Sequence, residues 1–330
     1  MKNKIEHGKR HFIGVDLGGT KIASVLVNED NLPLANVQMP TCPEEGQDAV
    51  MERIIASISE LASKLPGGID DVEAIGIGSP GPLDKELGMV VDAPNLKWKD
   101  VPVTSTIHVA TGLPVYLEND ANVAALAENR MGVGRGTKNM VYITVSTGIG
   151  SGLILDGRLY SGTTGGAGEL GHVTVVPDGP MCGCGNRGCL ESLASGTAIA
   201  KRAREAATRT AGSGILSAAG GKIDNIDAVL VSSCAEAGDP TATAILRNAF
   251  EYLGIVVANI VNLLNVEMVV IGGGVSQIGG MLFDTVRRVV DLRAFPFMAK
   301  DAKIVPAALG VDAGMLGAAC YAMEKQSGED

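Results

Sequence analysis

The chain has 330 residues, of which 46% are apolar and 19% are charged, and its net charge is −10 at neutral pH. This length is sufficient for two domains, and the composition is ordinary for a soluble globular protein. The negative charge argues against a nucleic acid or an anionic membrane as the main partner, because both attract clustered positive charge. A phosphorylated substrate remains compatible with it, since local lysines and backbone amides can bind phosphate.

Hydrophobic periodicity predicts alternating strands and helices in the first part of the chain. The expected strands lie at residues 12–15, 22–27, 34–38, 73–78 and 115–118. Helices are expected at residues 47–64 and 105–110. Together these elements form an α/β unit of roughly 118 residues.

The second part of the chain begins with a helix at residues 121–129 and then repeats the strand, glycine turn and strand of the N-terminus. Further strands are expected at residues 140–145, 152–156, 267–271 and 303–305, and further helices at 191–207, 241–264, 281–291 and 312–323. Residues 201–209 are interpreted as a solvated helix face, and residues 210–221 as a flexible surface loop. The repeated order indicates a weak internal duplication.

Two glycine-rich turns, DLGGTK at residues 16–21 and STGIGSG at residues 146–152, each join two predicted strands. Each therefore forms a hairpin whose backbone amides face a ligand, and not a loop that leads into a helix. This order excludes a Walker P-loop and a Rossmann fingerprint, because both place their glycines before a helix. A third run, VVIGGGVS at residues 269–276, ends an apolar strand in three glycines.

The DLGGTK turn groups side chains and amides that bind phosphate. Asp16 can hold Mg²⁺ directly or through water, and Thr20 and Lys21 can contact phosphate oxygens. The amides of Gly18 and Gly19 can form an anion nest. The alternative is a simple Asp-Gly hairpin turn, which the motif alone leaves open.

A metal-ligand pattern, H-x9-C-x-C-x4-C, is formed by His172, Cys182, Cys184 and Cys189. One imidazole and three thiolates suit tetrahedral Zn²⁺ and leave no position for water, so such a site is normally structural. The alternative is a set of unrelated thiols in a glycine-rich loop. The ligand spacing favours zinc.

Three features place the chain in the cytoplasm. The remaining cysteines, Cys42, Cys234 and Cys320, are scattered singly and fit buried thiols in a reducing compartment. The N-terminal segment reaches Asp16 after only a few apolar residues, which is too short for a signal peptide. Polar side chains interrupt the apolar region at residues 252–275, so it predicts a buried helix followed by a strand and no membrane span.

The chain resembles the ROK family of bacterial sugar kinases and repressors over residues 12–323. The resemblance rests on PNLKW at residues 94–98, LENDANVAALAE at 117–128, GIGSGL at 148–153 and CGCGNRGCLE at 182–191. The three glycine turns also match the phosphate, second phosphate and adenosine turns of the superfamily that contains sugar kinases, heat-shock proteins and actin. The resemblance implies that ATP is bound by Asp16, Gly18, Gly19, Thr20, Lys21, Thr147, Gly148, Gly273 and Gly274.

The resemblance makes Asp120 the general base that takes the proton of a sugar hydroxyl as its oxygen attacks the γ-phosphate. Its alternative role is to cap the helix that follows it, and the two roles are compatible. The resemblance implies that sugar hydroxyls are hydrogen-bonded by Asn95, Asn119, Asp120, Glu169, His172 and Glu191. Without it, Glu191 is an acidic residue of a first helical turn and Glu169 is a solvated loop charge. His172 can bind zinc through one ring nitrogen while the other donates to the sugar.

The resemblance implies a two-domain α/β fold of the actin-like ATPase type, which is ribonuclease H-like, with the active-site cleft between the domains. The small domain is expected to contain residues 1–118 and about 310–330. The large domain, residues 119–309, is expected to carry the zinc loop and the surface of a homodimer. Sugar binding is expected to close the domains and exclude water.

The activity implied by the resemblance is glucokinase activity, the glycolytic phosphorylation of D-glucose by ATP and Mg²⁺ to glucose 6-phosphate. A kinase for N-acetylglucosamine, N-acetylmannosamine, mannose or fructose is the alternative, since the motifs are shared across the family, and polyphosphate is an alternative donor. A sugar-sensing transcriptional repressor is disfavoured, because only about 11 residues precede the first strand and the acidic charge opposes DNA binding.

Overall fold

The computed structural model of the protein describes residues 9–209 and 214–328. The chain forms two compact units. The first contains the chain up to Gly136, Gly152–Ala167 and the chain from Ala308 onward, and the second contains Thr137–Ser151 and Gly168–Ala307. The first unit thus includes the helix that follows the expected boundary at residue 118.

A five-stranded sheet with the order β3-β2-β1-β4-β8 forms the centre of the first unit. Its strands are β1 (His11–Leu17), β2 (Lys21–Asn28), β3 (Pro33–Pro40), β4 (Val72–Ser79) and β8 (Val115–Asn119). The β1–β2 and β2–β3 pairs are antiparallel, whereas β1, β4 and β8 run parallel to one another. Each strand contains the range expected from the sequence.

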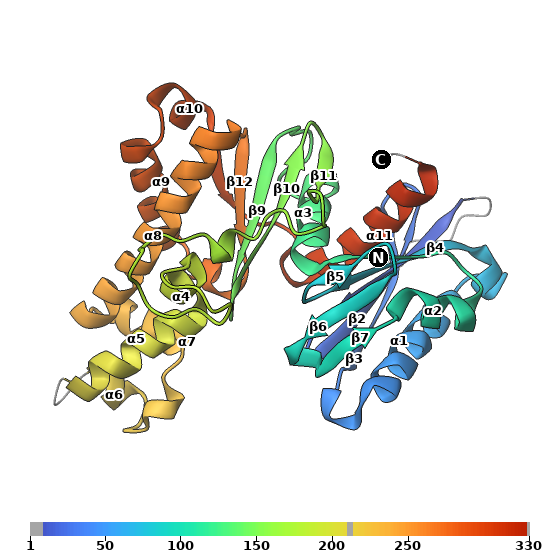
Figure 1. The fold of residues 1–330 in the computed structure, drawn as a ribbon, viewed down its shortest axis with the longest axis horizontal. Coiled ribbons are helices and arrows are strands. Elements are labelled where there is room, and N and C mark those ends of the chain that lie inside the picture. Colours follow the sequence, from blue (N-terminus) through green and yellow to red (C-terminus); the bar gives the residue numbers. More distant parts are fainter. Residues whose placement is uncertain (1–8, 210–213, 329–330) are drawn as a thin grey trace. The chain divides into compact units, whose positions relative to one another are not determined.

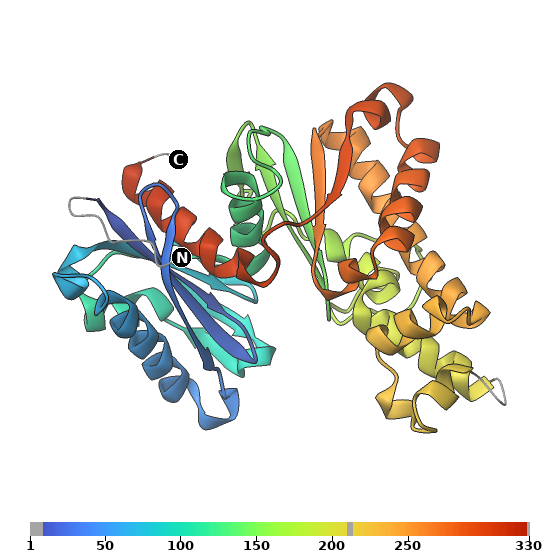
Figure 2. The ribbon, with the colours of Figure 1, turned by 180° about the vertical axis from the view of Figure 1, so that it is seen from behind.

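Helices cover both faces of this sheet (Figures 1 and 2). They are α1 (Gln47–Ala62), α2 (Val103–Thr111), α3 (Asp120–Arg130) and α11 (Ala313–Ser327). α1 and α2 pack on one face, and α11 packs on the other, against β1, β4 and α3. α11 approaches the sheet closely because Gly76 has no side chain. A Cβ atom there would lie 1.8 Å from the carbonyl oxygen of Ala318.

A small antiparallel sheet, which the sequence pattern does not predict, joins the first unit. Its strands are β5 (Leu83–Asp84), β6 (Met89–Ala93) and β7 (Trp98–Val101), in the order β5-β6-β7. Such short strands contain too few residues for period-2 alternation to be recognised. Val90, Trp98 and Val101 are nevertheless buried in the same hydrophobic cluster as residues of β1 and α1.

A second five-stranded sheet has the order β11-β10-β9-β12-β13. Its strands are β9 (Met140–Val145), β10 (Ile149–Leu155), β11 (Arg158–Tyr160), β12 (Met268–Gly272) and β13 (Lys303–Pro306). In both sheets the third, second, first, fourth and fifth strands follow one another, which confirms the predicted internal duplication. β10 begins at Ile149 and not at residue 152, so the turn before it is shorter than expected.

The helices of the second unit are α4 (Leu190–Ala194), α5 (Gly196–Arg209), α6 (Gly214–Ala218), α7 (Ala228–Glu236), α8 (Pro240–Leu264), α9 (Gly280–Arg293) and α10 (Pro296–Asp301). The single helix expected at residues 191–207 is wrong, because the chain breaks at Ser195, where ψ is 164°. The loop expected at residues 210–221 contains α6, and residues 210–213 lie outside the described part of the chain. α7 and α10 have no counterpart in the sequence prediction.

α8 is the central helix of the second unit and packs against α7 and α9. By length and composition alone α8 could cross a membrane, but 56% of its most apolar window is buried inside the protein. Leu253, Val257 and Val261 are fully buried, as in the core helix of a globular domain. The predicted buried helix followed by a strand is confirmed by α8 and β12.

Candidate active site

Two acidic side chains lie at one edge of the first sheet. β1, β4 and β8 are parallel, with Asp16 of β1 opposite Gly78 of β4 and Ser79 of β4 opposite Asn119 of β8. The carboxyl ends of these strands therefore meet at the same edge, which brings Asp16 and the first residue of α3, Asp120, to one side of the unit. Ligands of α/β proteins bind at this edge.

The DLGGTK segment forms the predicted hairpin between β1 and β2. The N–H of Gly18 donates to the carbonyl oxygen of Lys21 at 3.0 Å. Thr41, which follows β3, supports the turn from outside: its hydroxyl donates to the Gly18 carbonyl at 2.6 Å, and its N–H donates to the Thr20 carbonyl at 3.0 Å. Thr41 was not expected at the site, because nothing in the local sequence links it to the turn.

The environment of Asp16 favours a cation. Burial, followed by the nearby Asp120 carboxylate, raises the pKa of Asp16 from 3.8 to about 6, although Lys21 lowers it. Two carboxylates close together repel each other when both are ionised. A divalent cation would relieve this repulsion, and oxygen ligands of this kind suit Mg²⁺.

The strand-to-helix junction orients the proposed base. The side-chain oxygen of Asn119 accepts from the N–H groups of Ala121 at 2.9 Å and Asn122 at 3.3 Å, so Asn119 is the N-cap of α3. Asp120 shares in this capping, because its carboxylate accepts from the Ala121 N–H at 2.8 Å. The helix-capping role that the sequence offered for Asp120 therefore falls mainly to its neighbour.

Asn95 lies against the glycine hairpin of the first unit. It belongs to a short 3-10 helix, Pro94–Leu96. A Cβ atom on Gly19 would lie 3.0 Å from the Cβ atom of Asn95. The structure thus gathers three predicted groups within the first unit: the DLGGTK turn, Asn95 and the Asn119–Asp120 pair.

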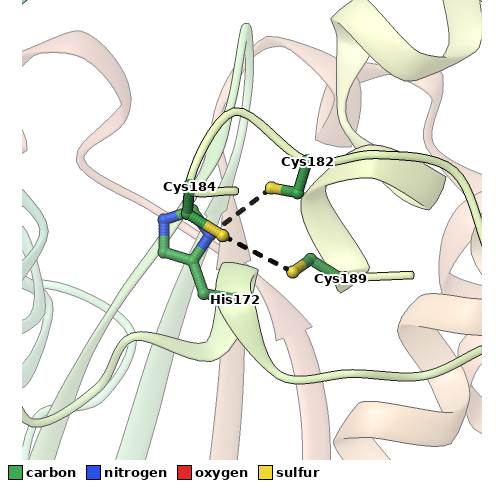
Figure 3. A group of neighbouring side chains, drawn as sticks. All are labelled: His172, Cys182, Cys184 and Cys189. Atoms are coloured by element: carbon green, nitrogen blue, oxygen red, sulfur yellow. Dashed lines mark hydrogen bonds between the residues drawn. The ribbon is translucent and has the colours of Figure 1, made fainter. Parts of the chain in front are cut away.

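The four predicted metal ligands form a cluster in the second unit (Figure 3). Their ligand atoms all lie within 4.8 Å of one another. Cys182 Sγ is 3.7 Å from His172 Nδ1, and Cys184 Sγ is 3.7 Å from Cys189 Sγ. Ligand atoms of a tetrahedral zinc with bonds of about 2.0–2.3 Å are separated by roughly 3.6–3.8 Å, so the residues fit this metal.

Backbone contacts build the loop that holds the cluster. The loop closes through isolated bridges between Thr174 and Cys189 and between Met181 and Arg187. Gly188 has a φ of +66°, and a Cβ atom on it would lie 1.6 Å from the Val176 carbonyl oxygen. Only glycine therefore fits beside Cys189.

The thiols of the cluster differ in acidity. Burial raises the pKa of Cys189 to about 12 and raises that of Cys182, whereas a backbone hydrogen bond at Asn186 lowers that of Cys184. A metal must therefore displace protons from the two buried thiols when it binds.

Two predicted sugar ligands adjoin this cluster. His172 presents Nδ1 to Cys182, and its Nε2 lies 3.9 Å from the Glu169 carboxylate. Glu191 lies 3.9 Å from Cys182 Sγ through one oxygen and accepts from the Ile149 N–H at 3.0 Å through the other. Glu191 thus connects the cluster to the turn that precedes β10.

This turn also receives the N-terminus of α5. The N–H of Gly196 donates to the Ser146 carbonyl at 2.8 Å, and the Thr197 hydroxyl donates to the Thr147 carbonyl at 2.8 Å. These bonds require the break between α4 and α5 at Ser195. The break therefore serves to place α5 beside the glycine turn.

A cavity of about 560 Å³ opens beside this turn within the second unit. Its lining combines the predicted Thr147 and Gly274 with Thr197 and Arg204 of α5 and Glu236 of α7. A volume of this size accommodates a nucleoside. The interpretation of residues 201–209 as a wholly solvated face is wrong for Arg204, whose Nε also donates to the Ile226 carbonyl at 3.0 Å.

The cavity residues on α5 and α7 were missed by sequence reasoning. Gly196, Ala200 and Arg204 recur at every fourth residue and so occupy one face of α5, which is a detectable signal. The α7 contribution was hidden because α7 itself was not predicted. Its start has a signature, since the Asp227 carboxylate accepts from the Leu230 N–H at 2.8 Å as an N-cap.

Known proteins resemble this chain over nearly its whole length. The glucokinase of Thermotoga maritima is 40% identical and covers 97% of this chain and 99% of its own. A ROK family glucokinase from Streptomyces griseus, solved with glucose and AMPPNP, is 36% identical with a TM-score of 0.78, covering 96% of this chain and 100% of its own. The xylose repressor of Caldicellulosiruptor bescii is 33% identical and covers 94% of this chain but 77% of its own.

The duplicated sheets, the glycine hairpins and the likeness to solved sugar kinases define a phosphotransferase with the actin-like ATPase fold. A family model described as the ROK family matches residues 12–325. The chain belongs to the ROK family.

Proposed function

We propose that the protein transfers the γ-phosphoryl group of ATP to the 6-hydroxyl of D-glucose, with Asp120 as the general base. The proposal is carried by the meeting of Asp16 and Asp120 at one sheet edge beside the DLGGTK hairpin. Phosphoryl transfer to an alcohol needs a base next to a cation that neutralises phosphate charge. The glucokinases among the relatives support glucose as the acceptor.

In the proposed reaction, the O6–H proton of glucose passes to the Asp120 carboxylate as O6 bonds to the γ-phosphorus. The bond from the γ-phosphorus to the bridging oxygen breaks, and ADP leaves with its electron pair. A general base contributes about 10²- to 10⁴-fold to such a step. Positioning, Mg²⁺ held with Asp16, and amide donors supply the remainder.

The nucleotide is proposed to use both glycine hairpins. The Gly19 amide, with Thr20 and Lys21, is assigned to the terminal phosphates, and Gly18 is assigned to shaping the turn, because its N–H donates to the Lys21 carbonyl. The nucleoside is assigned to the cavity of the second unit, which Thr147 and Gly274 line, and Gly148 and Gly273 flank these two residues.

Glucose is proposed to be bound by Asn95, Asn119 and Asp120 of the first unit and by Glu169, His172 and Glu191 of the second. Carboxylates and amides suit this task, because a sugar offers many hydroxyl groups and a missing one leaves a buried partner unpaired. Zn²⁺ is proposed to be held by His172, Cys182, Cys184 and Cys189. Its place is structural: it fixes the loop and directs His172 Nε2 away from the sulfurs.

The protein is further proposed to be cytoplasmic and to form a homodimer. Its free cysteines, Cys42, Cys234 and Cys320, support a reducing compartment.

The test is a coupled assay of ADP release by the purified protein with Mg²⁺, ATP and a panel of hexoses, with a parallel arm that supplies polyphosphate. Glucose is expected to give the highest kcat/KM. Asp120→Asn is expected to lower kcat by about 10²- to 10⁴-fold, because the base is removed. Asp100→Asn serves as the matched control, since Asp100 is exposed and its φ of 53° suits asparagine equally well.

Each part of the proposal fails separately. Absence of turnover with every hexose and both donors would contradict kinase activity. A higher kcat/KM for another hexose would replace glucose as the substrate. Full activity in Asp120→Asn would refute its assignment as the base while leaving the fold unaffected.

A further inference from the structure

Glu118 is a fully buried carboxylate immediately before the Asn119–Asp120 pair. Its side chain is 1% exposed, so it is shielded from solvent. It nevertheless accepts four hydrogen bonds from the first unit, two on each oxygen. The donors are the Asn119 N–H at 2.8 Å, Asn122 Nδ2 at 2.9 Å, Lys85 Nζ at 2.8 Å and the Ser161 hydroxyl at 3.3 Å.

The two oxygens of this carboxylate have different partners. Oε1 receives the Asn119 N–H and the Asn122 side chain, which lie on either side of Asp120 in the sequence. Oε2 receives Lys85, just after β5, and Ser161, just after β11. Glu118 therefore ties the peptide that carries the proposed base to two segments distant in the sequence.

This arrangement is costly to stability. A buried ion pair is often replaced by apolar residues without loss of stability, because desolvation of the charges offsets their attraction. Among the residues that the structure describes, the side-chain oxygen of Asn122 also has no hydrogen-bond partner, although Asn122 is 1% exposed. Because Nδ2 of Asn122 donates to Glu118, the amide oxygen is left unsatisfied, and a buried acceptor without a donor destabilises the fold. Groups retained at such a cost are typical of functional positions.

We propose that Glu118 is a positioning residue that fixes the direction of the Asp120 carboxylate, with Lys85 as its counter-charge. This inference rests on the proposed role of Asp120 as the base. Hydrogen bonds on both sides of Asp120 hold the end of β8 and the first turn of α3 in one arrangement. A displacement of about 1 Å at a reacting group can lower a rate by about 10²-fold, so this restraint acts on kcat.

The test compares the steady-state kinetics of Glu118→Gln with those of the wild type, using glucose, ATP and Mg²⁺. Glutamine keeps the shape of the side chain but replaces one acceptor oxygen with an NH₂ group. This group is itself a donor, so it cannot accept the two hydrogen bonds that the oxygen received. We expect kcat to fall by about 10- to 100-fold while the KM values for glucose and ATP stay close to those of the wild type. This split is the result that a general loss of structure would not produce.

The matched control is Glu128→Gln in the last turn of α3, the helix that follows Glu118. Glu128 is also fully buried and accepts from the N–H groups of Val133, Ala308 and Leu309. We expect this variant to lose thermal stability with kcat close to the wild-type value. An equal loss of kcat in both glutamine variants at equal stability would overturn the inference.

Lys85→Met provides a second variant, which keeps the inference testable if Glu118→Gln does not fold. Lys85 is 25% exposed in its side chain, so methionine retains its apolar contacts. Lys85→Met is also expected to lower kcat. The double variant with Glu118→Gln is expected to have the same kcat as Glu118→Gln alone. If the fold-losses of kcat in the two single variants multiplied in the double variant, Lys85 would not act through Glu118.

The remaining outcomes also decide whether Glu118 is a positioning residue. Wild-type kcat in Glu118→Gln, or a loss confined to KM, would refute the positioning role. If Glu118→Gln does not fold, wild-type kcat in Lys85→Met refutes it instead. Asp120→Asn is measured alongside: full activity there removes the proposed base itself, whereas its inactivity beside an active Glu118→Gln removes only this inference.

Discussion

The start of α3 divides capping and chemistry between two neighbouring residues. The side-chain oxygen of Asn119 accepts from two helix N–H groups, so the group that the proposed sugar site can use is its amide NH₂, which is a donor. Asp120 shares the Ala121 N–H, and this bond holds its carboxylate near the helix N-terminus.

At the residue scale, Asp16→Asn is expected to change how stability depends on pH. The pKa of Asp16 is 3.8 when unfolded and about 6 when folded, so the folded protein retains a proton that the unfolded chain has lost. The contribution of Asp16 to the free energy of unfolding is therefore fully present below about pH 4 and is lost as the pH rises through about 6. Relative to the wild type, Asp16→Asn should gain up to about 3 kcal/mol of unfolding free energy between pH 4 and 7.

The measurement is urea unfolding of both proteins at pH 4 and pH 7, with a chelator and without nucleotide. Titrations of groups that do not interact with Asp16 cancel in the difference between the two proteins. A stability difference that is the same at both pH values would contradict the raised pKa of Asp16.

At the scale of elements, the metal loop, which is the segment from Glu169 to Glu191 that carries the four candidate ligands, contacts segments that lie far apart in the sequence. His172 presents opposite ring nitrogens to Cys182 and to Glu169, and Glu191 connects Cys182 to the N–H of Ile149. Loss of the metal should therefore disturb sugar contacts as well as the loop itself. No step of the proposed phosphoryl transfer uses zinc.

Cys184→Ser is expected to reduce bound zinc well below one per chain and to lower the midpoint of thermal unfolding. It should also raise the KM for glucose by about tenfold, the equivalent of roughly one hydrogen bond. Metal content is measured by elemental analysis of protein purified without chelators, and KM by the ADP assay. Cys234→Ser, a buried thiol of α7 outside the loop, is the control. A variant without zinc that keeps the wild-type KM would break the link between metal and sugar.

At the scale of the whole molecule, one structural pattern occurs twice with different contents. Both five-stranded sheets share one strand order, and in both a glycine hairpin joins the first two strands. The first unit adds Asp16 and Asp120 at its sheet edge, and the second adds a cavity beside its hairpin. The duplication thus repeats the glycine hairpin, and the segments around the two hairpins carry Asp120, the cluster of one histidine and three cysteines, and the cavity.

Hydrogen exchange should separate the two ligands by the segments that each one protects. AMPPNP without sugar is expected to slow exchange in α5 and α7, which line the cavity, whereas glucose alone should slow it at the start of α3 and in the metal loop. At a ligand concentration of about 100 Kd, opening of these segments should become about 100-fold rarer. Amides of α10, away from both sets of residues, are the reference. Protection of α5 and α7 by glucose alone would contradict the assignment of the cavity to the nucleoside.

Much of the architecture follows from local patterns. The long strands of the first sheet and α1, α8 and α11 have long apolar or periodic patterns, and each was predicted close to its place. The misses are short or interrupted: β5, β6 and β7 have few residues, and α4 and α5 form one hydrophobic pattern that only the contact between Gly196 and Ser146 divides. That contact joins residues far apart in the sequence, so no local signal could reveal it.

The sequence by itself determined the hairpin nature of the glycine turns, the metal-ligand set and the family, because each depends on residue types at short, fixed spacings. Tertiary structure alone decided that Asp16 shares a sheet edge with Asp120, that Arg204 lines a cavity and that Glu118 is buried against Lys85. The physical reason is that burial and electrostatic coupling depend on distances between groups. Those distances are set only when strands and helices remote in sequence pack together.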